Sequence, residues 1–543
     1  MIQRIIVKGF RILRNFDWSP NEGVNIIVGD NASGKSTVLD AIELAMRCRL
    51  SGTRLTDGLD PYWFNCEDVA DFYRSLEEDE SNAVPPKILI EIYFQKDRGE
   101  IAHLQGANNS LTEDVPGIAL SISLDEELRG EFFDVVRNDE RHRHLIPVEY
   151  YSASWHSFSG QPLVKTPDTV ACFRIDANPS RSTHVVDYYA RNTVDAHMSD
   201  EDRRMISLKY RELKQGIDEK VLNSIVDDDE GIVDDISFQM DQSSRSDWRN
   251  SVTIHKGELP LSLSGQGVQV EARTRLALKK AVSKKVLLME EPENHLSHTS
   301  LTRLMGLIED HLTDRQLFVT THNAFVLNRL GLNRLALLHK GGSPSHIEDL
   351  SSDTVNYFRK QSGIDTLRIV LGERVVLVEG PSDEMIFNWA YEKKFSHAPQ
   401  EDAIDVIAYG VRGKRALELA SALRKTPVAV LRDNDGKPSD KWKKDAEPYL
   451  SEGRCMFVDD NTSLPTLEPQ MVRANSSNLS SFAKAIDFGD DSPNESDLVE
   501  FMVGNKTEWA WSFVTNTASL NSDFVIPPYI EAAVDFIGKS GNE

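Results

Sequence analysis

The sequence is poor in cysteine and in long apolar runs, and each shortage excludes a class of protein. Its four cysteines lie far apart and form no CxxC pair, which argues against a zinc ribbon and against a disulfide framework. No apolar run approaches the ~18 residues that a membrane span requires. The N-terminal MIQRIIVKGF lacks the apolar core and the cleavage site of a signal peptide. We therefore expect a cytoplasmic protein with no membrane partner.

Positive charge is also scarce. The chain holds 61 Lys and Arg against 86 Asp and Glu, a net charge of −25, whereas a passive nucleic-acid binder is basic because it neutralises phosphates. If this chain acts on nucleic acid, metal ions, local basic patches or a partner must bring the phosphates close. The stretches RGKR (412–415) and KPSDKWKK (437–444) could hold phosphates locally. The alternative is that they are solvated helix faces.

Strand and helix patterns alternate along the 543 residues, and this predicts the α/β fold class, with parallel sheets covered by helices. The apolar run VNIIV (24–28) predicts a buried strand, and helical spacing begins at Ser36. Strand-then-helix patterns start again near residue 372. We predict two domains, 1–370 and 371–543, with a poorly legible insert or dimerisation region at about 97–250. A helix is expected around 199–225, and the second domain is expected to carry a C-terminal extension.

The segment GDNASGKS (29–36) matches the P-loop pattern GxxxxGK[ST] between a strand and a helix. Glycines let the backbone wrap phosphates, and amides at a helix N-terminus face the anion. Lys35 is expected to reach the β- and γ-phosphates, and Ser36 to ligate Mg²⁺. A glycine turn capped by serine is the structural alternative. The candidate nucleotide-binding residues here are Gly29, Asn31, Gly34, Lys35, Ser36 and Thr37.

Two later strand ends carry residues that suit nucleotide hydrolysis. KKVLLMEEPENHL (284–296) runs into Glu290, expected to hold Mg²⁺ or its water, and Glu291, expected to polarise the attacking water. His322 follows the strand QLFVTT and could hydrogen-bond the γ-phosphate. Alone, a glutamate pair is often plain surface and a single histidine is usually structural. Their order after the P-loop favours the catalytic interpretation.

Together these motifs resemble an ABC-type ATPase head of the SMC-like branch, which opens with a segment such as VKGFR (7–11). LSLSGQGVQVEAR (261–273) resembles the signature loop, with Ser264 and Gly265 before a helix. The resemblance implies ATP and Mg²⁺, and a homodimer, or a higher assembly, in which each signature loop closes the partner's nucleotide. Two features depart from the family pattern: Glu290 replaces the usual Asp, and the signature reads SGQG. Gln95 is a glutamine-loop candidate by position only.

A second group of carboxylates follows two further strands. RVVLVEGPSDE (374–384) places Glu379 at a strand end and Asp383 in the first turn of a helix, and TPVAVLRDNDGKP (426–438) ends with Asp433 and Asp435. Ligands collect at the carboxyl edge of parallel sheets, and carboxylates without Cys or His suit Mg²⁺ or Mn²⁺. The alternatives are a tight turn at 433–436 and a dipole-stabilised helix start at Asp383.

This E-G-x-x-D and D-x-D spacing looks like a TOPRIM domain, a Rossmann-like parallel α/β fold. An ABC head with its P-loop in a mixed sheet, followed by a C-terminal TOPRIM domain, resembles the OLD (overcoming lysogenization defect) family of bacterial and phage-related nucleases. The resemblance adds Glu468 as a further metal ligand and Lys506 as a catalytic lysine. Alone, each would be an ordinary surface residue.

The leading hypothesis is an ATP-regulated, divalent-metal-dependent endonuclease that cleaves DNA. The family resemblance implies a role in bacterial antiphage defence, with a helicase or a retron reverse transcriptase and its DNA as a partner. The alternatives are a TOPRIM ribonuclease acting on RNA such as tRNA, and a non-catalytic ATP-dependent sensor or scaffold. A topoisomerase or primase fits less well, because the ATPase is ABC-like and zinc-finger cysteines are lacking.

Overall fold

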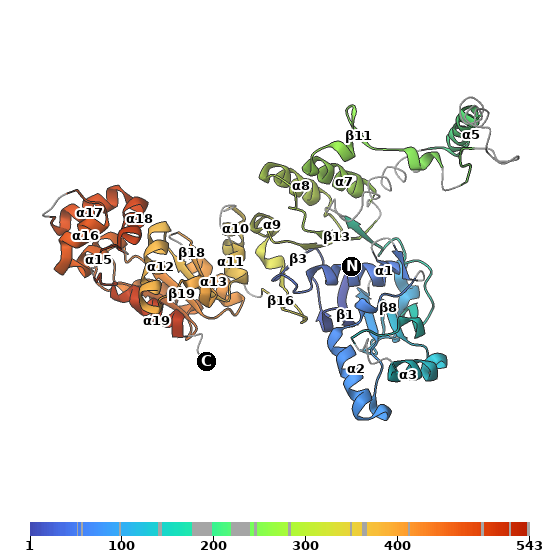
Figure 1. Cartoon of the computed structure of the whole chain (residues 1–543), viewed down its shortest axis with the longest axis horizontal. Helices are drawn as coiled ribbons and strands as arrows, with labels where there is room; N and C mark the ends of the chain where they lie inside the picture. Colours follow the sequence, from blue (N-terminus) through green and yellow to red (C-terminus); the bar gives the residue numbers. More distant parts are fainter. Residues whose placement is uncertain are drawn as a thin grey trace, which may run out of the picture. The chain divides into compact units, whose positions relative to one another are not determined.

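The computed structural model describes residues 1–50, 53–55, 58–96, 99–138, 144–175, 198–218, 239–243, 247–280, 284–347, 350–360, 366–410, 413–489, 493–517, 519–520 and 523–539. The chain divides into two compact units, Met1–Thr321 with Leu338–Pro344 and His322–Leu337 with Ser345–Glu543 (Figure 1). Part of the expected insert lies outside the described residues, and so does the end of the helix expected at 199–225. The described part of that helix is α5 (Asp200–Ile217). No helix in the described ranges is both long and apolar enough to cross a membrane.

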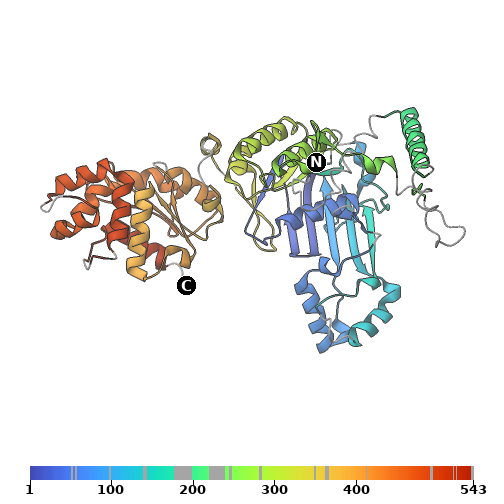
Figure 2. The same cartoon turned by 45° about the horizontal axis from the view of Figure 1, so that its top comes forward.

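The first unit contains an antiparallel sheet in the order β2-β1-β6-β8, with β7 and β9 also paired to β8. Its strands are β1 (Ile2–Phe10), β2 (Leu13–Trp18), β6 (Ile88–Phe94), β7 (Gln105–Gly106), β8 (Val115–Leu124) and β9 (Tyr151–Ser157). Helices α2 (Cys66–Glu78) and α3 (Arg129–Asn138) lie beyond one end of this sheet (Figure 2). In the VKGFR segment, Gly9 has φ +70°, and a Cβ there would lie 2.3 Å from the Lys87 carbonyl oxygen. Glycine is therefore required where β1 meets this neighbouring chain.

Four parallel strands of another sheet carry the nucleotide motifs, in the order β10-β13-β14-β3. These strands are β10 (Cys172–Ile175), β13 (Val286–Glu290), β14 (Gln316–Thr320) and β3 (Val24–Val28). All five residues of β3 are buried, which confirms the strand predicted at 24–28. Helix α1 (Lys35–Arg47) contacts strands of both sheets, and its buried residues include Asp40 and Glu43. Among its described residues, this unit also contains α7 (Gln266–Lys280) and α8 (His298–Asp310).

The second unit is built on a wholly parallel sheet in the order β18-β17-β19-β20. Its strands are β17 (Arg374–Val378), β18 (Ile404–Ala408), β19 (Val428–Arg432) and β20 (Arg454–Val458). Because β18 and β19 lie on opposite sides of β17, the strand order reverses between β17 and β19, where ligands bind in open parallel sheets. This arrangement and the sheets of the first unit confirm the α/β fold class.

Helices cover both faces of this second sheet. Ile386 on α12 and Ala533 on α19 belong to one apolar core with Val376 and Ala429, whereas Gly413 of α13 contacts Val430 on the opposite face. The same core includes the helices that follow the sheet, so the predicted C-terminal extension is packed against the domain. The helices are α9 (Ala324–Leu330), α10 (Ser352–Lys360), α11 (Thr366–Leu371), α12 (Pro381–Phe395), α13 (Gly413–Ala422), α14 (Ser439–Ala446), α15 (Leu467–Ala474), α16 (Leu479–Ala485), α17 (Glu495–Gly504), α18 (Lys506–Thr517) and α19 (Pro528–Lys539).

Candidate functional site

The P-loop connects β3 to α1, as its motif predicts. A Cβ at Gly29 would lie 2.5 Å from the Leu338 carbonyl oxygen and 2.6 Å from Ser33 Oγ, and Gly34 has φ +104°. The Ser33 hydroxyl is buried without a hydrogen-bond partner among the described residues. Lys35 donates to the Gly29 and Asp30 carbonyls, both at 2.8 Å. The narrow glycine backbone and the unused hydroxyl fit a phosphate chain.

Burial lowers the pKa of Lys35, and the nearby charges of Glu291 and Asp30 oppose that shift. Glu291 therefore lies within electrostatic reach of the P-loop lysine. It adopts φ +42°, a conformation that L side chains rarely take, and Asn294 donates to its Oε2 at 2.7 Å. Such local strain is characteristic of functional positions. Asn31 is exposed, and Ser36 and Thr37 are partly buried on the first turn of α1.

The two predicted Mg²⁺ ligands are already in contact, because the Ser36 hydroxyl donates to Glu290 Oε1. The other oxygen of Glu290 pairs with Arg174 on β10 at 2.7 Å. Arg174 also pairs with Asp40 and, at 3.1 Å, with Glu43 on α1. Arg174 was not among the residues predicted from the sequence, although a lone arginine within an otherwise apolar strand was a usable signal.

The remaining ATPase candidates are placed as follows. Ser264 and Gly265 immediately precede α7, and Gln269 of that helix donates to the Ser264 carbonyl at 2.8 Å. His322 is exposed and is the first residue of the second unit. Gln95 follows β6 of the antiparallel sheet, where its side chain bonds Glu22. The functional roles of Ser264, Gly265 and His322 stay predictions.

In the second unit, Glu379 and Asp433 follow adjacent strands, β17 and β19, at the point where the strand order reverses. Their oxygens Glu379 Oε1 and Asp433 Oδ1 are buried without a hydrogen-bond partner in the described part of the chain. Asp383 lies in the first turn of α12 and accepts from the Gly380 amide at 3.1 Å. Asp383 therefore also caps its own helix, which was the alternative interpretation.

The loop after β19 is held by Asn434, which is fully buried. Its amide donates to the carbonyls of Asp459, Asn461 and Leu464 at 3.2, 2.9 and 3.1 Å, and its Oδ1 accepts from the Gly436 amide at 2.8 Å. The Asx and glycine residues do form a tight turn, as one interpretation predicted. The same turn also presents carboxylates on both sides of Asn434.

These carboxylates influence one another. Burial and then the charges of Asp383, Glu379 and Glu468 raise the pKa of Asp433 to about 9. Burial and the charge of Glu379 raise the pKa of Asp383 to about 7. Burial likewise raises the pKa of Glu379, although Arg432 opposes that shift. Mutual repulsion between buried acids is relieved when a cation binds.

Arg432 now supplies part of the balancing charge. Its Nη2 lies 3.2 Å from Asp435 Oδ2, and its Nε lies 3.9 Å from Glu379 Oε1. Within the described ranges, no group of three or more His, Cys, Asp or Glu side chains lies close enough together to hold a metal ion without rearrangement. Buried carboxylate oxygens without partners and an all-oxygen donor set nevertheless fit Mg²⁺ or Mn²⁺. The role of Arg432 was not predicted from the sequence, although its position next to Asp433 at the strand end indicated that it could lie beside the carboxylates.

The two residues suggested by family resemblance lie close to this cluster. Glu468, in the first turn of α15, accepts from Thr466 at 2.6 Å and contributes to the raised pKa of Asp383. Lys506 is exposed at the start of α18, and its carbonyl accepts from the Ser382 hydroxyl at 3.1 Å, next to Asp383 in sequence. Residues remote in sequence are therefore brought to the same edge of the sheet.

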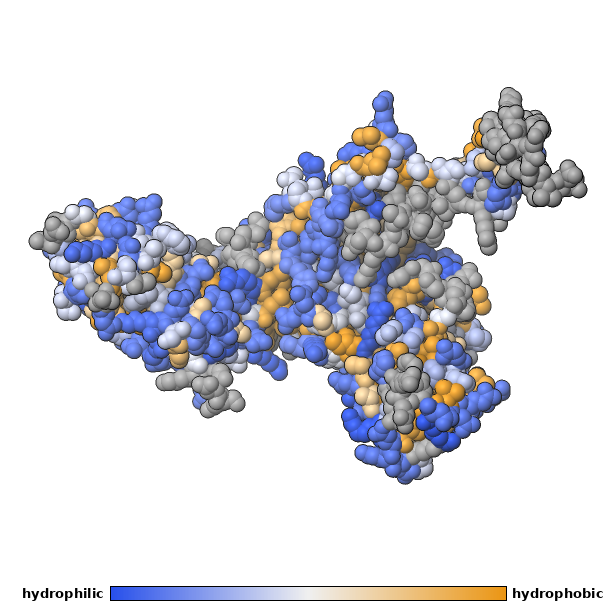
Figure 3. Space-filling view, in the orientation of Figure 1, coloured by the Kyte–Doolittle hydropathy of each residue, from blue (hydrophilic) through white to orange (hydrophobic). Residues whose placement is uncertain are grey.

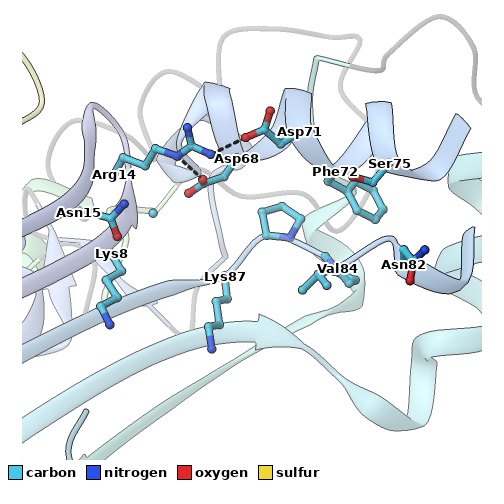
Figure 4. Close-up of a pocket in the computed structure, with 13 residues that line it drawn as sticks. Lys8, Arg14, Asn15, Asp68, Asp71, Phe72, Ser75, Asn82, Val84 and Lys87 are labelled. Carbon is cyan, nitrogen blue, oxygen red and sulfur yellow. Dashed lines mark hydrogen bonds and ion pairs between the residues drawn. The ribbon is translucent and has the colours of Figure 1, made fainter. Parts of the chain in front are cut away.

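A separate pocket of about 330 Å³ lies between β1, β2 and α2 in the first unit (Figure 4). Arg14 turns toward Asp68 and Asp71 on α2, with 2.7 Å to the Asp68 carboxylate. On the side of the pocket away from α2, the side chains of Lys8 and Lys87 point in the same direction. None of the predicted site residues lines this pocket.

Comparisons with known proteins assign both parts of the chain. Residues 24–328 match the family model described as "AAA domain, putative AbiEii toxin, Type IV TA system". Residues 371–435 match the "Overcoming lysogenization defect protein-like, TOPRIM domain". No curated protein matches the chain.

Solved structures give weak matches. The SMC head domain from Thermotoga maritima is 14% identical, over 64% of this chain and 99% of that one, with a TM-score of 0.29. The C-terminal region of the Burkholderia pseudomallei OLD protein is 17% identical, over 31% of this chain and 98% of that one, with a TM-score of 0.24. The C-terminal region of the Xanthomonas campestris pv. campestris OLD protein is 20% identical, over 31% of this chain and 96% of that one, with a TM-score of 0.23. The assignment therefore depends on the family models.

Proposed function

Because the chain belongs to the AAA-domain family described as putative AbiEii toxin, Type IV TA system, and carries an OLD-like TOPRIM domain, we propose that it is an ATP-regulated, divalent-metal-dependent nuclease. The observation that carries the proposal is the pair of partly buried carboxylates after β17 and β19, each with a buried oxygen that lacks a hydrogen-bond partner among the described residues. Their position at the strand-order reversal is where a parallel sheet binds its ligand.

In this proposal Glu379, Asp383, Asp433, Asp435 and Glu468 hold Mg²⁺ or Mn²⁺. Divalent cations at such a site activate a water and stabilise the leaving oxygen of a phosphodiester. Lys506, beside the first turn of α12, neutralises charge that develops on the phosphate. Asn434 keeps Asp433 and Asp435 in place through its bonds to the neighbouring loop.

The first unit binds ATP through Gly29 to Thr37, with Ser36 and Glu290 as the residues that hold Mg²⁺. Glu291 polarises the attacking water, and His322 contacts the γ-phosphate. Arg174 competes for Glu290, so an occupied nucleotide site has to redistribute this ion-pair network. Because Arg174 also pairs with Asp40 and Glu43, a change of its contact with Glu290 links the nucleotide state to helix α1.

We further propose a homodimer through the ATPase heads, in which Ser264 and Gly265 of one copy close the nucleotide of the other. Exposed apolar side chains beside this loop support the contact, since Leu259 and Leu263 are 60% and 74% exposed. Apolar surface is visible near β11 (His255–Lys256) in Figure 3. Free thiols at all four cysteines agree with a reducing, cytoplasmic location.

DNA is the proposed substrate, and defence against phage is the proposed role. The family description supports that role, because it names a putative toxin. A helicase or a retron reverse transcriptase with its DNA is the kind of partner that the OLD resemblance suggests. RNA is the alternative substrate, since this metal chemistry also cleaves RNA.

The test uses purified full-length protein with Mn²⁺ or Mg²⁺, offered supercoiled plasmid and tRNA in parallel, with and without ATP. Cleavage of plasmid alone supports the DNA nuclease, and cleavage of tRNA alone assigns a ribonuclease. The Lys35→Ala variant, which loses the amino group that spans the P-loop, should lose the response to ATP but keep the metal requirement. ATP hydrolysis without cleavage of either substrate would instead favour the non-catalytic sensor.

A further inference from the structure

Next to the acidic cluster, the second unit contains a groove of about 300 Å³ with basic and aromatic walls. Lys414 and Arg415 line it from the first turn of α13, Arg432 from the end of β19, and Trp442 from α14. Asp445 is the acidic residue among the described lining residues. This local positive charge contrasts with the net charge of −25 for the chain.

Trp442 lies among cations of the groove and of the chain beside it. The Arg432 guanidinium carbon lies 3.7 Å from the centre of the indole ring, and the amino groups of Lys437 and Lys441 lie 5.2 and 5.7 Å from it. The indole N–H donates to the Asn434 carbonyl at 2.9 Å. The aromatic platform is thereby fixed to the loop that carries the proposed metal ligands.

Arg432 connects the groove with the carboxylates. Its side chain is only 11% exposed, and it pairs with Asp435 and Glu379 while it stacks on Trp442. A planar guanidinium can bind two oxygens of a phosphate at once, which a lysine cannot do. When a divalent cation neutralises Glu379 and Asp435, the charge of Arg432 becomes available for a different anion.

We propose that this groove binds the sugar–phosphate backbone of the nucleic-acid strand beside the scissile bond, and that Arg432 positions a phosphate relative to the carboxylates. The inference rests on the proposed nuclease function and adds the surface along which the strand runs. Backbone contacts position a strand without reading its sequence. Recognition at this groove is therefore independent of sequence, and it depends on salt.

A purely structural role for Arg432, as the counter-ion of the carboxylates, makes a different prediction. It assigns no function to Lys414, which is exposed on α13 and has no part in that ion-pair network. Lys484, on α16 of the same unit, is also exposed, does not line the groove and lies outside both basic stretches. These two lysines therefore form a matched pair for substitution.

The experiment measures binding of a fluorescently labelled single-stranded oligonucleotide to the full chain by anisotropy. It is run with Ca²⁺ and with EDTA over a range of salt concentrations. Lys414→Ala should weaken binding about threefold to tenfold and reduce the salt slope by roughly 0.7, the value for one phosphate contact on a single strand. Arg432→Lys should weaken binding similarly in Ca²⁺, because it keeps the charge but loses the planar fork. Lys484→Ala should match the wild type in affinity and slope.

Further variants separate this inference from the nuclease proposal. Asp433→Asn should lose cleavage but keep oligonucleotide binding. Equal affinities and salt slopes for wild type, Lys414→Ala and Arg432→Lys, together with intact cleavage, would overturn the groove assignment and leave the nuclease proposal standing. Neither binding nor cleavage of DNA or RNA by the wild type would overturn both. Melting temperatures for each variant verify that a loss of binding is not a loss of fold.

Discussion

Replacing Asn434 with alanine should loosen the loop that carries Asp433 and Asp435. The side chain is fully buried and makes four hydrogen bonds, three donated to carbonyls and one accepted from the Gly436 amide. Because the amide group has two hydrogens for its three carbonyl acceptors, these contacts amount to about three full bonds, and at about 1 kcal/mol of net stabilisation per bond the substitution should cost roughly 3 kcal/mol. The substitution also removes the donor from three carbonyl oxygens in the protein interior, so the lost stability is not recovered elsewhere.

The assay is thermal unfolding combined with Mn²⁺ titration. For a domain of this size, roughly 3 kcal/mol corresponds to about 6–12 °C in melting temperature. The relevant transition is the one that Mn²⁺ raises, since a ligand stabilises the unit that binds it. Mn²⁺ affinity should fall by about 10- to 100-fold, as for other residues that support metal ligands. Asn461→Ala, an exposed asparagine in the same loop, is the matched control. A melting temperature and Mn²⁺ affinity equal to those of this control would refute the assigned role of Asn434.

Three further outcomes are expected. Arg174→Gln should destabilise the first unit by about 3 kcal/mol, because it removes the cation shared by Asp40, Glu43 and Glu290, and the remaining arginines at Asp40 and Glu43 replace only part of its charge. Arg47→Gln, at an outer partner of Glu43, should cost about 1 kcal/mol or less in denaturant unfolding. Gly9→Ala should lower the melting temperature, because a Cβ there would lie 2.3 Å from a carbonyl oxygen at φ +70°, whereas Gly130→Ala, in open space, should not. Without metal, the second unit should lose stability as the pH rises toward 9. Asp433 has a folded pKa of about 9, well above its unfolded value, so its stabilising contribution is present at low pH and is lost as that proton leaves. Mn²⁺ should reverse this trend in melting temperature and should bind more tightly as the pH rises.

Short-range motifs explain why much of both sites was predictable from sequence. The P-loop is a strand, a glycine turn and a helix in one continuous segment, so its geometry follows from local spacing. Glu379 and Asp433 each end an apolar strand, and parallel pairing brings such ends to one edge. The contact between Ser36 and Glu290 follows from the same rule applied to β3 and β13.

The partners of residues that act through tertiary contacts were not predictable, even where the residue itself stood out in the sequence. Arg174 depends on β10 pairing beside β13, which no local pattern specifies. Arg432 was not predicted, and Trp442 was visible only as part of the basic stretch 437–444, because their stacking depends on how α14 returns to the end of β19. Lys506 was suggested by resemblance, and its place beside Ser382 follows from the packing of α18 on α12.

The most direct test of the central claim is the rate of Mn²⁺-dependent plasmid and tRNA cleavage by wild type, Asp433→Asn and Asp440→Asn. Asp440 is an exposed carboxylate in the first turn of α14 and serves as the matched control. A metal nuclease centred on β17 and β19 predicts that Asp433→Asn loses cleavage of whichever substrate the wild type cuts, while Asp440→Asn cuts like the wild type. Cleavage by Asp433→Asn at the wild-type rate would contradict that assignment.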